Sequence, residues 1–105
     1  MIADIAAHRE ELAQLCVRFG VRRLDVFGSA ARGDFDAARS DIDLLVEFEP
    51  MAPGAYADAF SGLKEMLEAQ LARRVDLVDR KAIETSRNSI RKRHILTGAE
   101  SVYAA

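Results

Sequence analysis

The stretch FGSAARGDFDAARSDIDLLVEF, residues 27–48, decides the fold of this chain. It opens with a Gly28-Ser29 turn and closes in an apolar run that carries Asp41 and Asp43. Residues two apart in a strand point to the same face, so these acids project together while the alternate apolar residues line the opposite face. Their Cα atoms would lie about 6.6 Å apart at a rise of about 3.3 Å per residue. Two carboxylates this close repel each other, which favours a cation between them.

A hard divalent cation resolves this repulsion, because Mg²⁺ prefers oxygen ligands and usually keeps several water or phosphate ligands. A third acid, Asp76, lies in the compact run RRVDLVD, residues 73–79, which has the pattern of a neighbouring strand. Asp76 could join Asp41 and Asp43 in holding two ions about 3.5–4 Å apart. The acids therefore predict a site for phosphoryl or nucleotidyl transfer. Taken alone, Asp41 and Asp43 also fit a strand cap and a solvent-facing side chain on a one-sided sheet.

The Gly28-Ser29 turn supplies the other half of such a site. Gly28 has no Cβ, so the backbone can approach a ligand closely, and the amides of a strand-to-helix turn point toward an anion. The Ser29 hydroxyl adds a donor for a triphosphate oxygen. No GxxxxGK[ST] or GxGxxG motif accompanies the turn, so Walker and Rossmann nucleotide sites are unsupported.

The combination resembles the nucleotidyltransferase superfamily typified by DNA polymerase beta. A Gly-Ser turn follows a strand. After eleven intervening residues comes Asp-Ile-Asp in an apolar run, and later a Val-Asp-Leu strand. GSAARG…SDIDLLV in so short a chain looks like the minimal nucleotidyltransferases (MNT proteins), the antitoxin halves of HEPN/MNT toxin–antitoxin pairs. The resemblance covers residues 21–79 and weakens over the C-terminal segment.

The resemblance implies a role for each matching residue. The acids that match the catalytic and metal-binding positions of the family are Asp41, Asp43 and Asp76. The residues that match its triphosphate-contacting turn are Gly28 and Ser29. Arg32 matches a basic residue common in the MNT group, for which we expect either a phosphate or partner role or a structural pairing with Asp34 or Asp36.

The implied reaction is transfer of AMP from ATP, with two Mg²⁺ ions as cofactor, to a tyrosine hydroxyl of a HEPN toxin. Larger family members look as though they bind their acceptor with extra domains, and this chain has no room for one. Two alternatives stay open. One is an antitoxin that neutralises by binding alone, through the C-terminal helix and the SVYAA tail. The other is a small-molecule nucleotidyltransferase, which the chain length disfavours.

Composition narrows the class of protein further. A chain of 105 residues predicts one domain, residues 1–105, and a hydrophobic fraction of 50% fits a folded protein. The formal charge of −2 predicts no direct nucleic-acid partner. Cys16 is the only cysteine and no apolar run approaches about 20 residues, so we expect a cytoplasmic protein without a membrane partner. Homo- and hetero-oligomers both fit the sequence.

Hydrophobic periodicity predicts an α/β fold, a small mixed β-sheet with flanking helices like that of polymerase beta. The expected helices cover residues 2–19, 30–32, 55–71 and 81 to at least 96, and the expected strands cover 23–27, 41–48 and 73–79. We expect the three acids on one sheet face and the helices on the other. In the last helix Ile83 and Ile90 form a thin apolar side, with Ile95 opposite them, so we expect this helix to cover a polar site, to await a partner or to be solvated. A basic run, Arg87, Arg91, Lys92 and Arg93, is interpreted as a solvated face.

Overall fold

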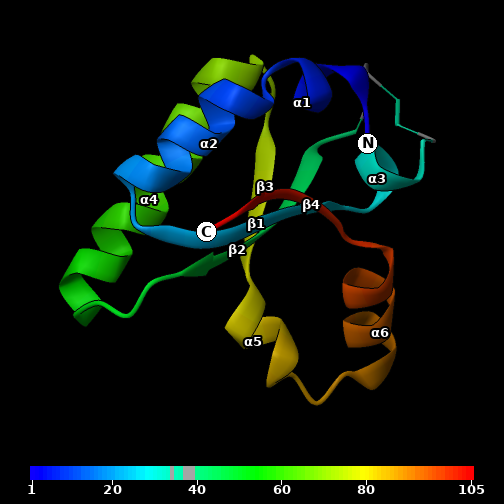
Figure 1. Cartoon of the computed structure of the whole chain (residues 1–105). Helices are drawn as coiled ribbons and strands as arrows, with labels where there is room; N and C mark the ends of the chain where they lie inside the picture. Colours follow the sequence, from blue (N-terminus) through cyan, green and yellow to red (C-terminus); the bar gives the residue numbers. More distant parts are fainter. Residues whose placement is uncertain (34, 37–39) are drawn as a thin grey trace.

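A four-stranded mixed sheet forms the centre of the molecule (Figure 1). The computed structural model describes residues 1–33, 35–36 and 40–105. The strands are β1 (Val21–Phe27), β2 (Ile42–Phe48), β3 (Val75–Asp79) and β4 (Glu100–Ala104), in the order β3-β2-β1-β4. β1 runs antiparallel to both of its neighbours, whereas β2 and β3 are parallel. The predicted fold class, a small mixed sheet with flanking helices, is confirmed.

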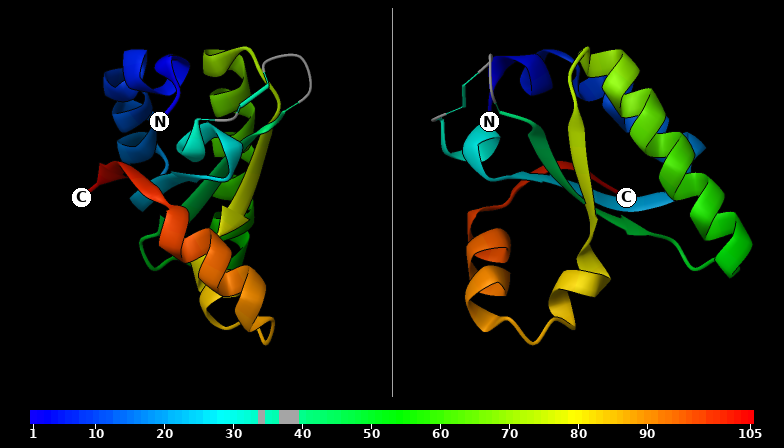
Figure 2. Two further views of the ribbon diagram at one scale, coloured as in Figure 1. Left: turned by 90° about the vertical axis from the view of Figure 1, so that its right-hand side faces the viewer. Right: turned by 180° about the vertical axis from the view of Figure 1, so that it is seen from behind.

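The helices lie on both sides of this sheet (Figure 2). α1 (Ala3–Ala7), α2 (Arg9–Arg18) and the long α4 (Pro53–Leu71) pack on one face. α5 (Arg80–Glu84) and α6 (Ser89–Gly98) lie on the other, and the short α3 (Ser29–Arg32) follows β1. The expected helix over residues 2–19 is two helices that meet at His8. The loop expected after α3 includes residues 34 and 37–39, which lie outside the described part of the chain.

Two hydrophobic clusters hold the layers together. The larger lies between the sheet and α1, α2 and α4, and its fully buried members include Leu12, Cys16, Leu24, Leu44 and Leu63. The smaller lies on the opposite face and consists of Phe27, Leu45, Ile83 and Ile95. Helices therefore cover part of the acid-bearing face too, contrary to expectation. The physical reason is Leu45, which shares its strand face with Asp43 and would otherwise expose a large apolar side chain to water.

The C-terminal segment differs most from the prediction. The continuous helix expected from residue 81 is broken between α5 and α6, where the Asn88 side chain accepts a hydrogen bond from the Arg91 amide (3.1 Å) and caps α6. The SVYAA tail forms most of the edge strand β4 and pairs with β1. Ile95 is buried and Ile90 is 72% exposed, the reverse of the expected orientation. In the described residues, no helix is long and apolar enough to cross a membrane.

Candidate functional site

Two of the predicted acids lie side by side near the starts of the neighbouring strands β2 and β3. Asp43 on β2 is in register with Asp76 on β3, and in register with Phe27 at the end of β1. Neighbouring strands lie about 4.8 Å apart, and residues in register point to the same face, so the two carboxylates share one face at close range. Asp41 precedes β2 by one residue and belongs to the same face by alternation. The sheet register thus brings together acids that are far apart in the sequence.

The electrostatics of Asp43 reflect this arrangement. Partial burial, together with the negative charges of Asp76 and Asp41, raises the pKa of the Asp43 carboxyl above its ordinary value. The positive charge of Arg32 opposes the shift and lowers the same pKa. The ionised form of Asp43 is therefore disfavoured in the free protein, and a cation among the acids would relieve the repulsion.

The side chains of the three acids do not form a complete metal-binding site in this conformation. Among residues 1–33, 35–36 and 40–105, no group of three or more His, Cys, Asp or Glu side chains could hold a metal ion. Asp41 pairs with Arg74 at the surface (3.5 Å). The three acids nevertheless fit a hard divalent cation, because all of them offer carboxylate oxygens. Asp43 and Asp76, which are in register, also repel each other, and a cation would relieve this repulsion. For all three acids to share an ion, Asp41 would have to leave Arg74.

Gly28 lies against Asp43, at the turn between β1 and α3. Its backbone has φ +68° and ψ −149°, a conformation open almost only to glycine. A Cβ at this position would collide with the Asp43 carboxylate. The missing side chain therefore permits the contact between turn and acid. Ser29, the first residue of α3, follows directly and is partly exposed.

A pocket of about 380 Å³ extends from this turn toward α6. Gly28 and Arg32 line one side of it. The α6 residues that line it are Arg93, His94, Thr97 and Gly98. Sequence analysis missed these four residues and placed Arg93 on a solvated face. The sequence carried no clear signal for them, because Ile95 was expected opposite the apolar side of the helix, whereas its burial turns the adjacent side of α6 toward the turn.

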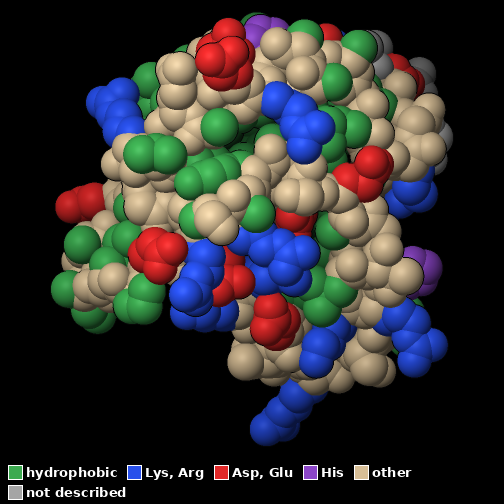
Figure 3. Space-filling view, in the orientation of Figure 1, with side chains coloured by type: hydrophobic (Ala, Val, Ile, Leu, Met, Phe, Trp, Pro, Cys, Tyr) green, Lys and Arg blue, Asp and Glu red, His purple; other side chains and the backbone are tan. Residues whose placement is uncertain are grey.

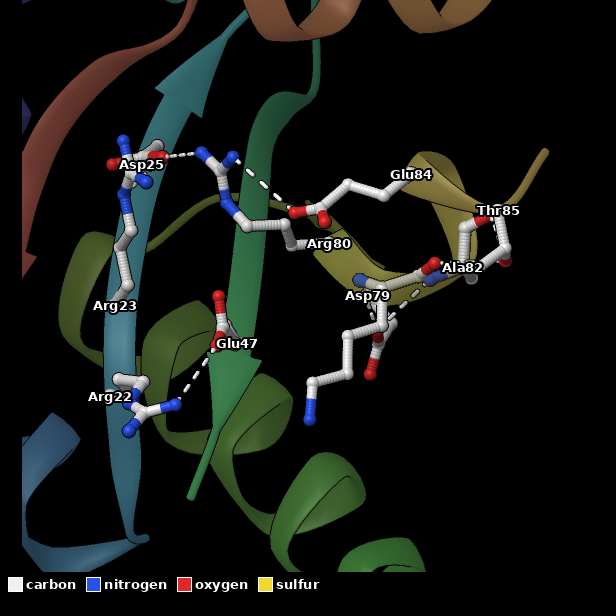
Figure 4. A network of polar contacts seen from close by, with 10 residues as sticks. Arg22, Arg23, Asp25, Glu47, Asp79, Arg80, Ala82, Glu84 and Thr85 are labelled. Carbon is white, nitrogen blue, oxygen red and sulfur yellow. Dashed lines mark hydrogen bonds and ion pairs between the residues drawn. The ribbon is translucent and has the colours of Figure 1, made fainter. Parts of the chain in front are cut away.

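A buried ion pair fixes α5 to the same sheet face (Figure 4). Asp25 on β1 accepts a hydrogen bond from Arg80, the first residue of α5, and both side chains are almost completely buried. Arg23 and Glu84 flank the pair at 3.2 and 3.8 Å. In the described residues, Oδ1 of Asp25 and Nε of Arg80 have no hydrogen-bond partner. Sequence analysis missed this pair because its members lie on separate elements, each beside other charged residues.

Comparison with known proteins assigns the chain to a family. The nucleotidyltransferase domain family matches residues 7–97. The chain belongs to this family. Its nucleotidyltransferase activity, predicted from the spacing of the Gly-Ser turn and the acids, follows from that membership.

Individual relatives of this nucleotidyltransferase are similar over most of its length. Protein adenylyltransferase MntA of Thermococcus cleftensis is 43% identical over 81 residues, which cover 77% of this chain and 75% of that protein. A solved structure assigned as a minimal nucleotidyltransferase has a TM-score of 0.71 at 37% identity and covers 90% of this chain and 89% of its own. The resemblance to the MNT proteins is confirmed.

A more distant structure shares the fold. It belongs to the complex of an MNT antitoxin with the tri-AMPylated HEPN toxin of Shewanella oneidensis, with a TM-score of 0.62 at 18% identity. The match covers 96% of this nucleotidyltransferase and 73% of that chain.

Proposed function

We propose that this nucleotidyltransferase transfers AMP from ATP to a hydroxyl group, most simply a tyrosine, of a HEPN toxin and thereby acts as its antitoxin. The observation that carries the proposal is the register of Asp43 with Asp76 beside the glycine-only turn at Gly28. Two relatives support the acceptor: one is named a protein adenylyltransferase, and the other is similar in fold and occurs in complex with an AMPylated HEPN toxin.

The acids would hold the metal that the family implies. Asp41, Asp43 and Asp76 offer the carboxylate oxygens that Mg²⁺ prefers, and we expect two ions. When bound, the ions would neutralise phosphate charge and lower the pKa of the acceptor hydroxyl. Burial and repulsion by Asp76 and Asp41 raise the pKa of Asp43, and a cation beside it would offset this shift.

The remaining groups orient the substrates. Gly28 leaves space for the triphosphate next to Asp43, Ser29 offers a hydroxyl donor, and Arg32 supplies positive charge on the same side. In the reaction, the acceptor oxygen attacks the α-phosphorus in line, and the bond to pyrophosphate breaks. We assign removal of the acceptor proton to Asp76, which lies on β3 at the exposed side of the site.

The alternative of neutralisation by binding alone keeps one supporting observation. The SVYAA tail pairs within the sheet as β4, so only its outer edge could contact a partner. α6, however, exposes Ile90 among basic residues, and a large apolar side chain in such a position suits a protein interface. An enzyme that docks on its acceptor protein would also need such a surface, so the exposed Ile90 fits both the catalytic and the binding function.

Label transfer tests the proposal. Wild-type protein incubated with α-labelled ATP, Mg²⁺ and the purified cognate HEPN toxin should label the toxin. Asp43→Asn should abolish labelling, while Glu47→Gln, four residues along on the same strand face, should leave it intact. Absence of labelled toxin in the presence of an assembled complex would contradict the proposal.

A further inference from the structure

We infer that α6 forms the second wall of the nucleotide site and that Arg93 binds the polyphosphate of the nucleotide from the side opposite Gly28 and Arg32. This inference rests on the proposed function and adds a binding residue to it. It starts from the pocket between the turn and α6, which two segments far apart in the sequence enclose. Its volume of about 380 Å³ falls within the range of small-molecule sites, about 300–1,000 Å³.

The pocket adjoins Asp43 through Gly28, although none of the three acids lines it. Gly28 lines it and also contacts the Asp43 carboxylate, so a ligand in the pocket lies next to that acid. Arg32 lines the same wall, and its positive charge acts on Asp43. A nucleotide whose phosphates meet the acids and the turn would therefore also reach the opposite wall.

The packing of α6 determines which of its residues form that wall. Ile95 is 6% exposed and packs with Phe27 and Leu45, which anchors the helix on the sheet. Residues four apart in a helix lie on one side, so Arg93 and Thr97 face the pocket together, as do His94 and Gly98. Ile90 lies one turn before His94 on the same side of α6, does not line the pocket and is 72% exposed.

The charges across the pocket favour a polyanion. Arg32 and Arg93 bring positive charge to two walls of one cavity, which favours an anion between them. Guanidinium forks match phosphate oxygens in pairs of hydrogen bonds. In the described part of the chain, Arg93 has no ion pair that would compete for it. Figure 3 shows further Lys and Arg side chains at the end of the molecule where α5 and α6 lie, which adds to the positive potential.

The test measures binding of ATP and of AMP to the full chain by calorimetry in Mg²⁺ buffer. Arg93→Gln should weaken ATP binding about tenfold or more, because it removes charge-assisted hydrogen bonds, and should weaken AMP binding far less. Arg93→Lys should recover part of the loss, since it restores the charge without the fork. Arg91→Gln is the matched control: it removes the same charge from the same helix outside the pocket and should stay within about twofold of wild type. Inorganic triphosphate should displace ATP from wild type and much less well from Arg93→Gln.

The outcomes separate this inference from the proposed function. If wild type binds ATP, Arg32→Gln weakens that binding and Arg93→Gln matches Arg91→Gln, the role of Arg93 is wrong and the proposed function stands. If Arg93→Gln weakens ATP and AMP equally, the contact is not to the polyphosphate and the inference fails. If wild type binds no nucleotide, both fail. Thermal unfolding of each variant checks that the fold is retained.

Discussion

Replacing Asp25 by alanine should destabilise the protein by about 3 kcal/mol. The substitution leaves the Arg80 charge buried at 8% exposure, and the ion pair that remains to it in the described residues is with the half-exposed Glu84 at 3.8 Å. Breaking a buried ion pair by removing one partner costs about 3–5 kcal/mol, and the remaining Glu84 contact places this case at the lower end. For a domain of this size, such a loss lowers the melting temperature by about 12 °C or more.

A double variant makes the prediction sharper. One oxygen of Asp25 and one nitrogen of Arg80 are already buried without a hydrogen-bond partner in the described structure, so the pair itself carries a desolvation cost. Asp25→Leu combined with Arg80→Met should therefore recover most of the stability that Asp25→Ala loses. As a control, Glu47→Ala removes a surface pair with the exposed Arg22 (3.6 Å) and should cost less than about 1 kcal/mol.

Urea denaturation followed by circular dichroism measures all three free energies of unfolding. If Asp25→Ala costs no more than Glu47→Ala, the buried charge is hydrated or otherwise compensated, and the reasoning from burial is wrong. If the double variant is as unstable as the single one, the cost comes from lost packing and not from the unpaired charge.

Two further predictions concern Gly28 and Cys16. Gly28→Ala should lose ATP binding and about 1–3 kcal/mol of stability, because the new Cβ collides with Asp43 in a backbone conformation that glycine alone adopts easily. Gly33→Ala also meets a positive φ (+91°), but its Cβ would meet no atom of the described residues within 4 Å, so it should lose stability and keep ATP binding; equal binding losses would refute the role of the contact with Asp43. Burial raises the pKa of the Cys16 thiol from 9.0 to about 12, so between these values the unfolded chain releases a proton that the folded chain keeps. Stability should then fall as pH rises above about 9, by about 1.4 kcal/mol per pH unit from this group. Comparison of unfolding at pH 8 and pH 10 should show a smaller decrease for Cys16→Ala; an equal decrease would mean that Cys16 does not titrate differently in the two states.

Strand periodicity in the sequence was enough to predict which side chains of the candidate site share a sheet face. The alternation around Asp41 and Asp43 specified the face that carries the acids, and the second acid of this pair is in register with Asp76 as expected. Gly28 was predicted as a site of close backbone approach, and its contact with Asp43 supplies the physical reason. The shared face of Asp41 and Asp43 is a local feature, because a residue two positions away always shares the strand face.

The features that were missed depend on tertiary packing. Leu45 required cover on the acid-bearing face, and α5 and α6 supply it through Ile83 and Ile95. Since α6 has a weak apolar periodicity, the sequence did not show which side of it would be buried. β4 was assigned to a tail because a five-residue segment with one buried residue, Val102, gives little strand signal by itself. Its stability comes from pairing with β1.

The central claim is that the protein modifies its partner and does not only bind it. The most direct measurement is the intact mass of the cognate HEPN toxin after incubation with ATP, Mg²⁺ and either wild type or Asp76→Asn. We predict a gain of about 329 Da per adenylyl group with wild type and none with Asp76→Asn, although both proteins form the complex. Only the wild type should then leave the toxin inactive after the two proteins are separated. A toxin that never gains mass, and that both proteins neutralise equally while bound, would contradict the catalytic account.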